Sequence, residues 1–130
     1  FHNGVTDDEY ATLLRRATAL VSLSRAEGYG LPLVEAMALG TPVIASDIPI
    51  FREVGGHAAS YVDPGSAAEF AAAAKKLRDD GHWQDVSRQS VARAAEFSWD
   101  ESARQLVDVA HDIVAMRSGR KRPAHPAQTA

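Results

Sequence analysis

The chain has 130 residues, enough for one domain or part of one, and with 45% hydrophobic and 24% charged residues it is ordinary for a globular protein. It contains no cysteine, which excludes disulfides and thiolate metal sites, and no apolar run approaches the roughly 18 residues of a membrane span. The net charge is −3, but the first 116 residues carry 10 basic and 17 acidic side chains, a balance that makes general nucleic-acid binding unfavourable.

The first half of the chain alternates between helical and strand patterns. Three acids at positions 7–9 suit the positive end of a helix dipole, so we expect a helix over residues 7–17. Thr6 directly precedes it and is the expected cap. The apolar stripe of this helix consists of Tyr10, Leu13, Leu14 and Ala17. The segments that follow are predicted as strand 19–24, helix 32–40 from Pro32 to Gly40, strand 42–46, helix 49–55 and strand 59–63.

The second half is predicted to be helical. An alanine-rich helix covers residues 66–80, with Phe70, Ala73, Ala74 and Leu77 on its inner stripe. A second helix covers residues 83–97, and Ser98 is the expected cap of a last helix over 99–116. Residues 117–130 combine Pro, Gly, Ala and basic side chains without an apolar period, so we expect a basic disordered tail there.

Short apolar strands that alternate with helices indicate an α/β fold with a parallel sheet and helices on both faces. Only three complete strands are found, and residues 1–5 are predicted to end a fourth that starts before residue 1. We therefore expect the C-terminal part of a Rossmann-like doubly wound parallel sheet. Residues 1–116 would form this partial domain.

The stretch AEGYGLPLVEAMALGTPVIAS, residues 26–46, carries the chemistry. It lies beyond the carboxyl end of strand 19–24, where open parallel sheets bind ligands. Gly28 and Gly30 allow close backbone approach, and the free amides at the start of helix 32–40 suit a phosphate or diphosphate. Glu27 and Glu35 would repel phosphate, but a carboxylate can accept hydrogen bonds from a pair of sugar hydroxyls. A nucleotide sugar, with hydroxyls on both sides of its diphosphate, fits this pattern.

The order Glu27-Gly-Tyr-Gly-Leu-Pro-Leu-Val-Glu35-Ala-Met-Ala-x-Gly-x-Pro-Val resembles the Glu-x7-Glu signature of the retaining glycosyltransferases of family 4 (group 1). The similarity continues in SDIPIFREVGG (46–56), YVDP (61–64) and FSW (97–99), and covers roughly residues 4–114. Enzymes of this family have the GT-B fold. The resemblance implies a fragment of the C-terminal, donor-binding domain of such an enzyme.

The resemblance also implies roles for individual residues. Glu27 would be the catalytic residue that contacts the donor hexose and its developing charge, and Glu35 would bind the ribose hydroxyls. The donor sugar and phosphate oxygens would be bound by backbone amides at Gly28, Tyr29, Gly30 and Leu31. Transfer would retain the anomeric configuration, with the leaving phosphate as base, and would need neither a metal nor another cofactor.

The implied function is transfer of a hexose from a nucleotide diphosphate sugar to a glycan or lipid-linked acceptor. Because SDIPIFREVGG is similar to mannosyltransferases of bacterial polysaccharide assembly, GDP-mannose is our first choice of donor. An N-terminal domain of the same chain would supply the cations for the diphosphate. The expected location is cytoplasmic, with peripheral contact at the inner membrane face and no nucleic-acid partner.

Two other functions fit the same residues. The first is a non-catalytic module that binds a nucleotide sugar or a partner chain, and the second is a related epimerase or phosphorylase-like enzyme with the same fold. Ser46 and Asp47, at the end of strand 42–46, are explained equally well by a ligand and by turn formation. Arg52 and Glu53 are expected on the solvated face of helix 49–55.

Overall fold

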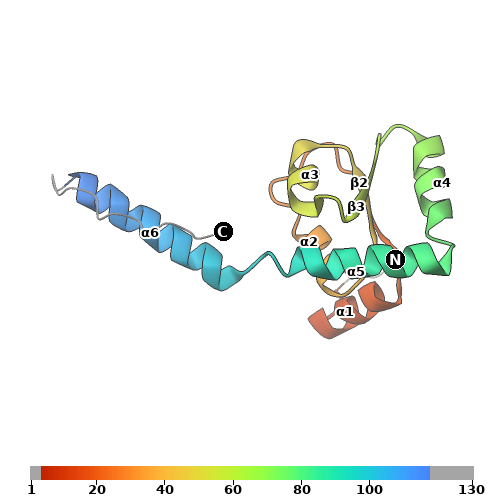
Figure 1. The fold of residues 1–130 in the computed structure, drawn as a ribbon, viewed down its shortest axis with the longest axis horizontal. Coiled ribbons are helices and arrows are strands. Elements are labelled where there is room, and N and C mark those ends of the chain that lie inside the picture. Colours follow the sequence, from red (N-terminus) through yellow and green to blue (C-terminus); the bar gives the residue numbers. More distant parts are fainter. Residues whose placement is uncertain (1–3, 118–130) are drawn as a thin grey trace. The chain divides into compact units, whose positions relative to one another are not determined.

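The computed structural model describes residues 4–117, and the chain divides into two units, residues 1–97 and 98–130. The elements of the first unit alternate between helix and strand (Figure 1). They are α1 (Asp7–Arg16), β1 (Leu20–Ser22), α2 (Leu31–Ala38), β2 (Val43–Ser46), α3 (Pro49–Gly55), β3 (Ala59–Val62), α4 (Ala67–Lys76) and α5 (Asp80–Ala94). The second unit contains α6 (Trp99–Arg117).

The three strands form one parallel sheet in the order β1-β2-β3. Ile44 of β2 lies opposite Val21 of β1 and Ser60 of β3, which fixes the register on both sides of the central strand. All four residues of β2 are buried, as expected for a parallel strand covered on both faces.

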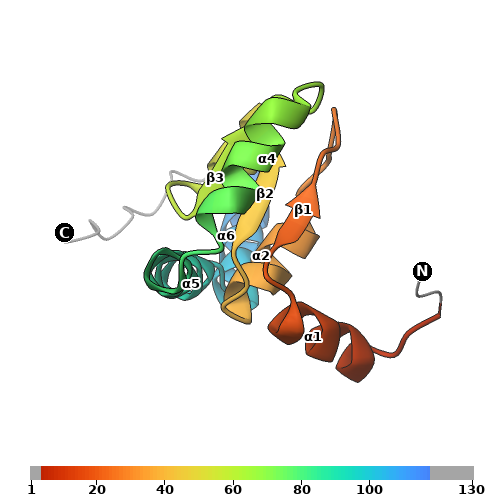
Figure 2. The same cartoon turned by 90° about the vertical axis from the view of Figure 1, so that its right-hand side faces the viewer.

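Helices cover both faces of this sheet, and each face has its own core (Figures 1 and 2). Alternate residues of β2 point to opposite faces, so that Val43 and Ala45 join one cluster and Ile44 joins the other. The first cluster packs the sheet against α1, α2, α3 and the end of α5, with Leu14, Leu33, Ala36, Met37, Phe51, Val54 and Ala94 among its buried residues. The second cluster contains Ile44, Val62 and Leu77, against which Phe70, Ala73 and Ala74 pack. The predicted α/β fold class and the inner stripe of the alanine-rich helix are therefore confirmed.

Side-chain caps explain where several helices begin. Thr6 and Glu9 form a capping box at α1, in which the Thr6 amide donates to Glu9 Oε2 at 2.8 Å. Ser66 accepts a hydrogen bond from the amide of Glu69 at the start of α4. In the second unit, Ser98 Oγ accepts from the Glu101 amide at 3.3 Å, which confirms the predicted cap of α6.

The structure corrects several predicted boundaries. The helix expected over 66–80 ends at Lys76, and the one expected over 83–97 runs from Asp80 to Ala94. The earlier start follows from Asp79, whose carboxylate accepts the His82 amide at 2.7 Å and so caps a helix with Gly81 in its first turn. The strand expected over 19–24 covers only Leu20–Ser22.

The predicted end of a fourth strand at residues 1–5 is not seen in its described part, since Gly4 and Val5 form no strand and residues 1–3 lie outside the described range. Of the predicted tail, residues 118–130 also lie outside it, and Arg117 ends α6. No helix in the described part of the chain has the length and apolar character that crossing a membrane requires.

Candidate functional site

The candidate site is the connection between β1 and α2, residues 23–30, which leaves the carboxyl end of its strand. Gly30 caps α2 in a left-handed conformation, with φ 84° and ψ 34°, and no side chain caps the helix. The helix begins at Leu31, so Pro32 occupies its second position rather than the first. A prolyl residue there removes no intrahelical hydrogen bond and favours the helical φ.

Gly30 is needed at this position for two reasons. Its positive φ is a conformation that residues with a Cβ adopt at a cost. A Cβ added at Gly30 would also lie 3.3 Å from two ring carbons of Phe51, which is fully buried beneath the loop. The backbone of the loop therefore packs closely against the Phe51 ring of α3 at Gly30.

The main-chain amides of this connection are free. Gly28, Tyr29, Gly30 and Leu31 donate no main-chain hydrogen bond to any residue that the structure describes. The first amide with a partner is that of Leu33, which donates to Gly30 O at 3.0 Å. A helix start with unpaired amides, a partial positive charge and no side-chain cap can bind an anion such as a phosphate.

The two predicted glutamates lie on either side of these amides, Glu27 in the loop and Glu35 in the middle of α2, and both are exposed. Glu27 has no hydrogen bond or ion pair with any other residue in the described part of the chain. Tyr29 and Leu31 are also exposed, at 49% and 42%. The loop thus presents its polar and apolar side chains to solvent rather than to the core.

Glu35 has one neighbour that the sequence did not predict. Tyr10, on α1, lies near its carboxylate. Burial raises the pKa of Tyr10, and the neighbouring Glu35 carboxylate raises it further. We had placed Tyr10 on the apolar stripe of its helix, and its ring does pack against the first core cluster. The stripe pattern says nothing about a neighbour 25 positions away, so Glu35 was not expected near Tyr10.

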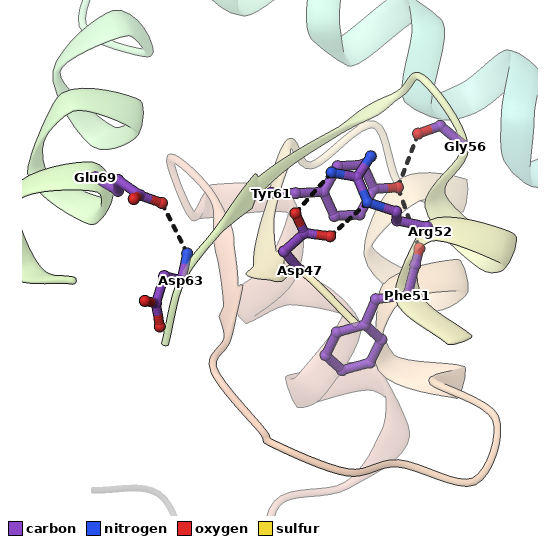
Figure 3. Close-up of polar contacts among 7 residues, drawn as sticks. All are labelled: Asp47, Phe51, Arg52, Gly56, Tyr61, Asp63 and Glu69. Carbon is purple, nitrogen blue, oxygen red and sulfur yellow. Dashed lines mark hydrogen bonds and ion pairs between the residues drawn. The ribbon is translucent and has the colours of Figure 1, made fainter. Parts of the chain in front are cut away.

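The next connection along the sheet, between β2 and α3, is built differently (Figure 3). Asp47 follows β2 and binds the Arg52 guanidinium through both carboxylate oxygens, with Arg52 Nη2 at 2.7 Å from Oδ2. The Arg52 guanidinium carbon lies 4.6 Å from the centre of the Tyr61 ring on β3. Arg52 and Glu53 are exposed, as expected for the solvated face of this helix, and the ion pair with Asp47 and the contact with Tyr61 are features that the sequence did not predict.

The middle and the C-terminal end of helix α3 are held by side chains from β3 and α5. The Tyr61 hydroxyl lies 3.1 Å from Phe51 O and 2.8 Å from Gly56 O. Arg93 of α5 donates from Nε to Val54 O at 3.0 Å and from Nη2 to Glu53 O at 2.6 Å, and so satisfies carbonyls at the end of the helix. Because Phe51 supports Gly30, these contacts also support the loop.

Two further observations concern polar groups near this edge. Ser46, the last residue of β2, is fully buried, and its hydroxyl has no hydrogen-bond partner among the described residues. Within the described range, no group of three or more His, Asp or Glu side chains could hold a metal ion. The expectation of a reaction without metal or cofactor stays a prediction.

The comparisons with known proteins agree with this fold. A parallel sheet with helices on both faces is typical of the doubly wound class, whose members bind ligands at the carboxyl ends of the strands. The model of the family described as "Glycosyl transferases group 1" matches residues 1–96. The chain belongs to this family, and the expected relation to GT-B enzymes is confirmed by its solved relative below.

Three relatives illustrate the match. The chain is 31% identical over 105 residues to O-antigen chain mannosyltransferase B of Escherichia coli, covering 80% of this chain and 28% of that protein. It is 36% identical over 118 residues to the MMP alpha-(1->4)-mannosyltransferase of Mycolicibacterium hassiacum, with coverage of 87% and 29%. A solved structure of sucrose-phosphate synthase from Thermosynechococcus elongatus superimposes with a TM-score of 0.76 at 28% identity, with coverage of 88% and 30%. The chain therefore spans less than a third of each of these proteins.

Proposed function

We propose that this chain is the donor-binding part of a retaining hexosyltransferase that uses a nucleotide diphosphate sugar. In this proposal Glu27 contacts the donor hexose and stabilises the charge that develops on it. Glu35 accepts hydrogen bonds from the ribose hydroxyls, and the amides of Gly28, Tyr29, Gly30 and Leu31 bind donor sugar and phosphate oxygens. The acceptor is a glycan or a lipid-linked glycan, which meets the donor in a cleft completed by an N-terminal domain.

One observation carries the proposal: two exposed carboxylates flank a helix start whose amides have no partner in the described part of the chain. An anion at the amides and hydroxyls at the carboxylates would satisfy both kinds of group. Family membership supports a glycosyl donor as the molecule that combines them.

Mannose, carried by GDP, is the donor that we propose first. The support is the naming of several relatives as mannosyltransferases, which is a property of those proteins. A thermal-shift panel of GDP, UDP and ADP sugars with the full-length protein tests the choice. A larger shift with a UDP or ADP sugar than with GDP-mannose would contradict it.

Substitution of the two glutamates tests their assigned roles in the full-length protein. Glu35→Ala should weaken the binding of free nucleotide and of nucleotide sugar alike, because both carry the ribose. The loss of a charged hydrogen-bonding group typically costs about 1.5–3 kcal/mol of binding free energy. Glu27→Ala should lower turnover more than it lowers free-nucleotide affinity, because its proposed partner is the hexose. Isothermal titration calorimetry and turnover measurements distinguish the two patterns.

Several outcomes would argue against this assignment. If the unaltered protein and Glu35→Ala bind the nucleotide with equal affinity, Glu35 does not contact the ribose. Donor binding without any sugar transfer would favour a non-catalytic binding module instead. The proposal also includes a cytoplasmic location with peripheral contact at the inner membrane face, which sedimentation of the full-length protein with anionic and neutral vesicles tests.

A further inference from the structure

We propose that Phe51 is a positioning residue for the nucleotide site: its ring holds Gly30 so that the free amides at the start of α2 are already oriented when a diphosphate arrives. The inference rests on the phosphate-binding role of these amides proposed above. It adds to the site a residue of α3 that does not itself touch the nucleotide.

The Phe51 ring packs against one point of the loop. A Cβ built on Gly30 lies 3.3 Å from Cδ1 and 3.3 Å from Cε1 of this ring. Apart from Gly30 and its neighbours in the chain, no other atom of the described residues lies within 4 Å of that position. In the described part of the chain, Phe51 is therefore the side chain that supports this side of Gly30.

Gly30 is also held through its carbonyl group. Gly30 O accepts a hydrogen bond from the Leu33 amide at 3.0 Å, and Leu33 is buried in the same core cluster as Phe51. The Gly30 carbonyl and the Leu31 amide belong to one planar peptide group. Because the carbonyl is bonded and the Cα is packed, the fold also sets the direction of the Leu31 N–H, which has no partner among the described residues.

The Phe51 ring can serve as a support because α3 is itself fixed. Phe51 is fully buried. The Tyr61 hydroxyl on β3 lies 3.1 Å from Phe51 O (Figure 3), and Arg93 Nε on α5 donates to Val54 O at 3.0 Å. Contacts from two other elements thus hold the helix that carries the ring, and the ring gives the loop a fixed surface.

Such a support matters because the loop contains two glycines. Glycine loses more conformational freedom on ordering than any other residue, and ordering a loop on binding costs affinity. At Gly28 nothing lies within 4 Å of an added Cβ, so no packing restrains that position. At Gly30 the ring of Phe51 removes part of the cost before the ligand binds, at the end of the loop that is nearest the helix dipole.

The proposal predicts an effect that depends on the phosphates. In the full-length protein, we would use whichever of GDP, UDP or ADP binds most tightly, together with its nucleoside, which carries base and ribose but no phosphate. Phe51→Leu removes the ring and should weaken the diphosphate about three- to tenfold, the cost of ordering a mobile group, while the nucleoside affinity stays unchanged. Phe51→Met refills more of the space with a flexible side chain and should give a smaller loss of the same kind. Calorimetry, by displacement for the nucleoside, measures both affinities.

Val54→Ala is the matched control. Val54 lies on the same helix and is buried in the same cluster, but none of its atoms lies within 4 Å of the Cβ position at Gly30. The ratio of diphosphate to nucleoside affinity should therefore be the same in Val54→Ala as in the unaltered protein.

A second measurement needs no substitution. In the unaltered full-length protein without nucleotide, the amides of Gly30 and Leu31 should have NMR order parameters of about 0.85, the value of rigid backbone. This measurement decides the question if neither Phe51 variant folds.

The outcomes separate this inference from the proposed function. If the diphosphate binds more tightly than the nucleoside and both Phe51 variants keep that ratio, the phosphate site stands and the role of Phe51 is overturned. Equal weakening of both ligands in Phe51→Leu, the same fall in ratio in Val54→Ala, or order parameters below about 0.6 would also overturn it. If the unaltered protein binds the diphosphate no better than the nucleoside, or binds neither, the proposed function fails first.

Discussion

Two strand-to-helix connections leave the carboxyl edge of the same sheet, and they treat their polar side chains in opposite ways. After β2, Asp47 is bound by Arg52, which stacks on Tyr61. After β1, Glu27 has no partner among the described residues, and the four amides that follow it are also unpaired. The first arrangement is complete in itself, whereas the second leaves donors and acceptors for a ligand.

Exposure alone does not distinguish these two regions. The side chains of Asp47 and Arg52 are 47% and 56% exposed, so all of these charges face solvent to a large extent. What differs is whether a partner on the protein already satisfies the charge. A charged residue at the ligand edge of a sheet is therefore a better candidate for binding when the fold offers it no counter-charge, and Glu27 meets that condition while Asp47 does not.

The largest contrast between the regions is expected from adding one methyl group to each. In Gly55→Ala, the new Cβ would lie 2.6 Å from Tyr61 Oη and 2.9 Å from Ala59 Cβ, so the clamped region must move. We expect a loss of about 3 kcal/mol in the free energy of unfolding, the upper end of the usual cost of overpacking. In Gly28→Ala nothing lies within 4 Å of the added Cβ, and stability should change by less than about 0.5 kcal/mol.

Urea denaturation of the two alanine variants and the unaltered protein measures this contrast. A similar loss in both variants would mean that the β1–α2 loop is as tightly packed as the region around α3. That result would remove the physical basis for treating the two connections differently.

Short sequence patterns predicted the elements whose bounds depend on residues that are neighbours in the chain. Helix 49–55 was predicted with its observed bounds, because Pro49 marks its start and the Gly55-Gly56 pair marks its end. The β2 strand and the inner stripe of α4 followed from apolar pattern alone. The site residues Glu27 and Glu35 were found through a motif, and their exposure agrees with that hypothesis without testing it.

Contacts between distant residues could not be predicted in this way. The proximity of Tyr10 to Glu35 and the capping of α3 by Arg93 bring together residues that are 25 and about 40 positions apart. Neither residue differs locally from an ordinary member of its helix, so only packing reveals the contact. The contact of Arg52 with Tyr61 was not predicted for a related reason: Arg52 is exposed as expected, and its stacking depends on a tyrosine from the next strand.

A smaller contrast is expected from removing one hydroxyl in each region. The Tyr61 hydroxyl contacts two main-chain oxygens and is partly buried, so Tyr61→Phe should lower the free energy of unfolding by about 1–2 kcal/mol. The Tyr29 hydroxyl has no partner in the described part of the chain, and the residue is 49% exposed. Tyr29→Phe should leave stability unchanged. Thermal denaturation of both variants is the measurement, and a loss in Tyr29→Phe equal to that in Tyr61→Phe would contradict the distinction.

The smallest effect concerns how the free energy of unfolding changes at acid pH. Arg52 hydrogen-bonds to Asp47 and lowers the pKa of that carboxyl below its ordinary value. A carboxyl with a lowered pKa in the folded state binds protons more weakly than in the unfolded chain, so its contribution is complete above the unfolded pKa of about 4 and disappears as the pH falls below it. Asp47→Asn should therefore lose slightly more stability at pH 7 than at pH 3, which urea denaturation at both pH values measures.

Arg52→Gln tests whether Arg52 is the cause of that pH dependence. Without the guanidinium, the pKa of Asp47 should return toward its ordinary value. The difference in the free energy of unfolding between pH 7 and pH 3 should therefore shrink, as it does in Asp47→Asn. The double variant should show no further change, because both substitutions remove the same interaction. Additive effects of the two substitutions would mean that Asp47 and Arg52 act independently, and the β2–α3 connection would then leave its charges as available as those of the loop after β1.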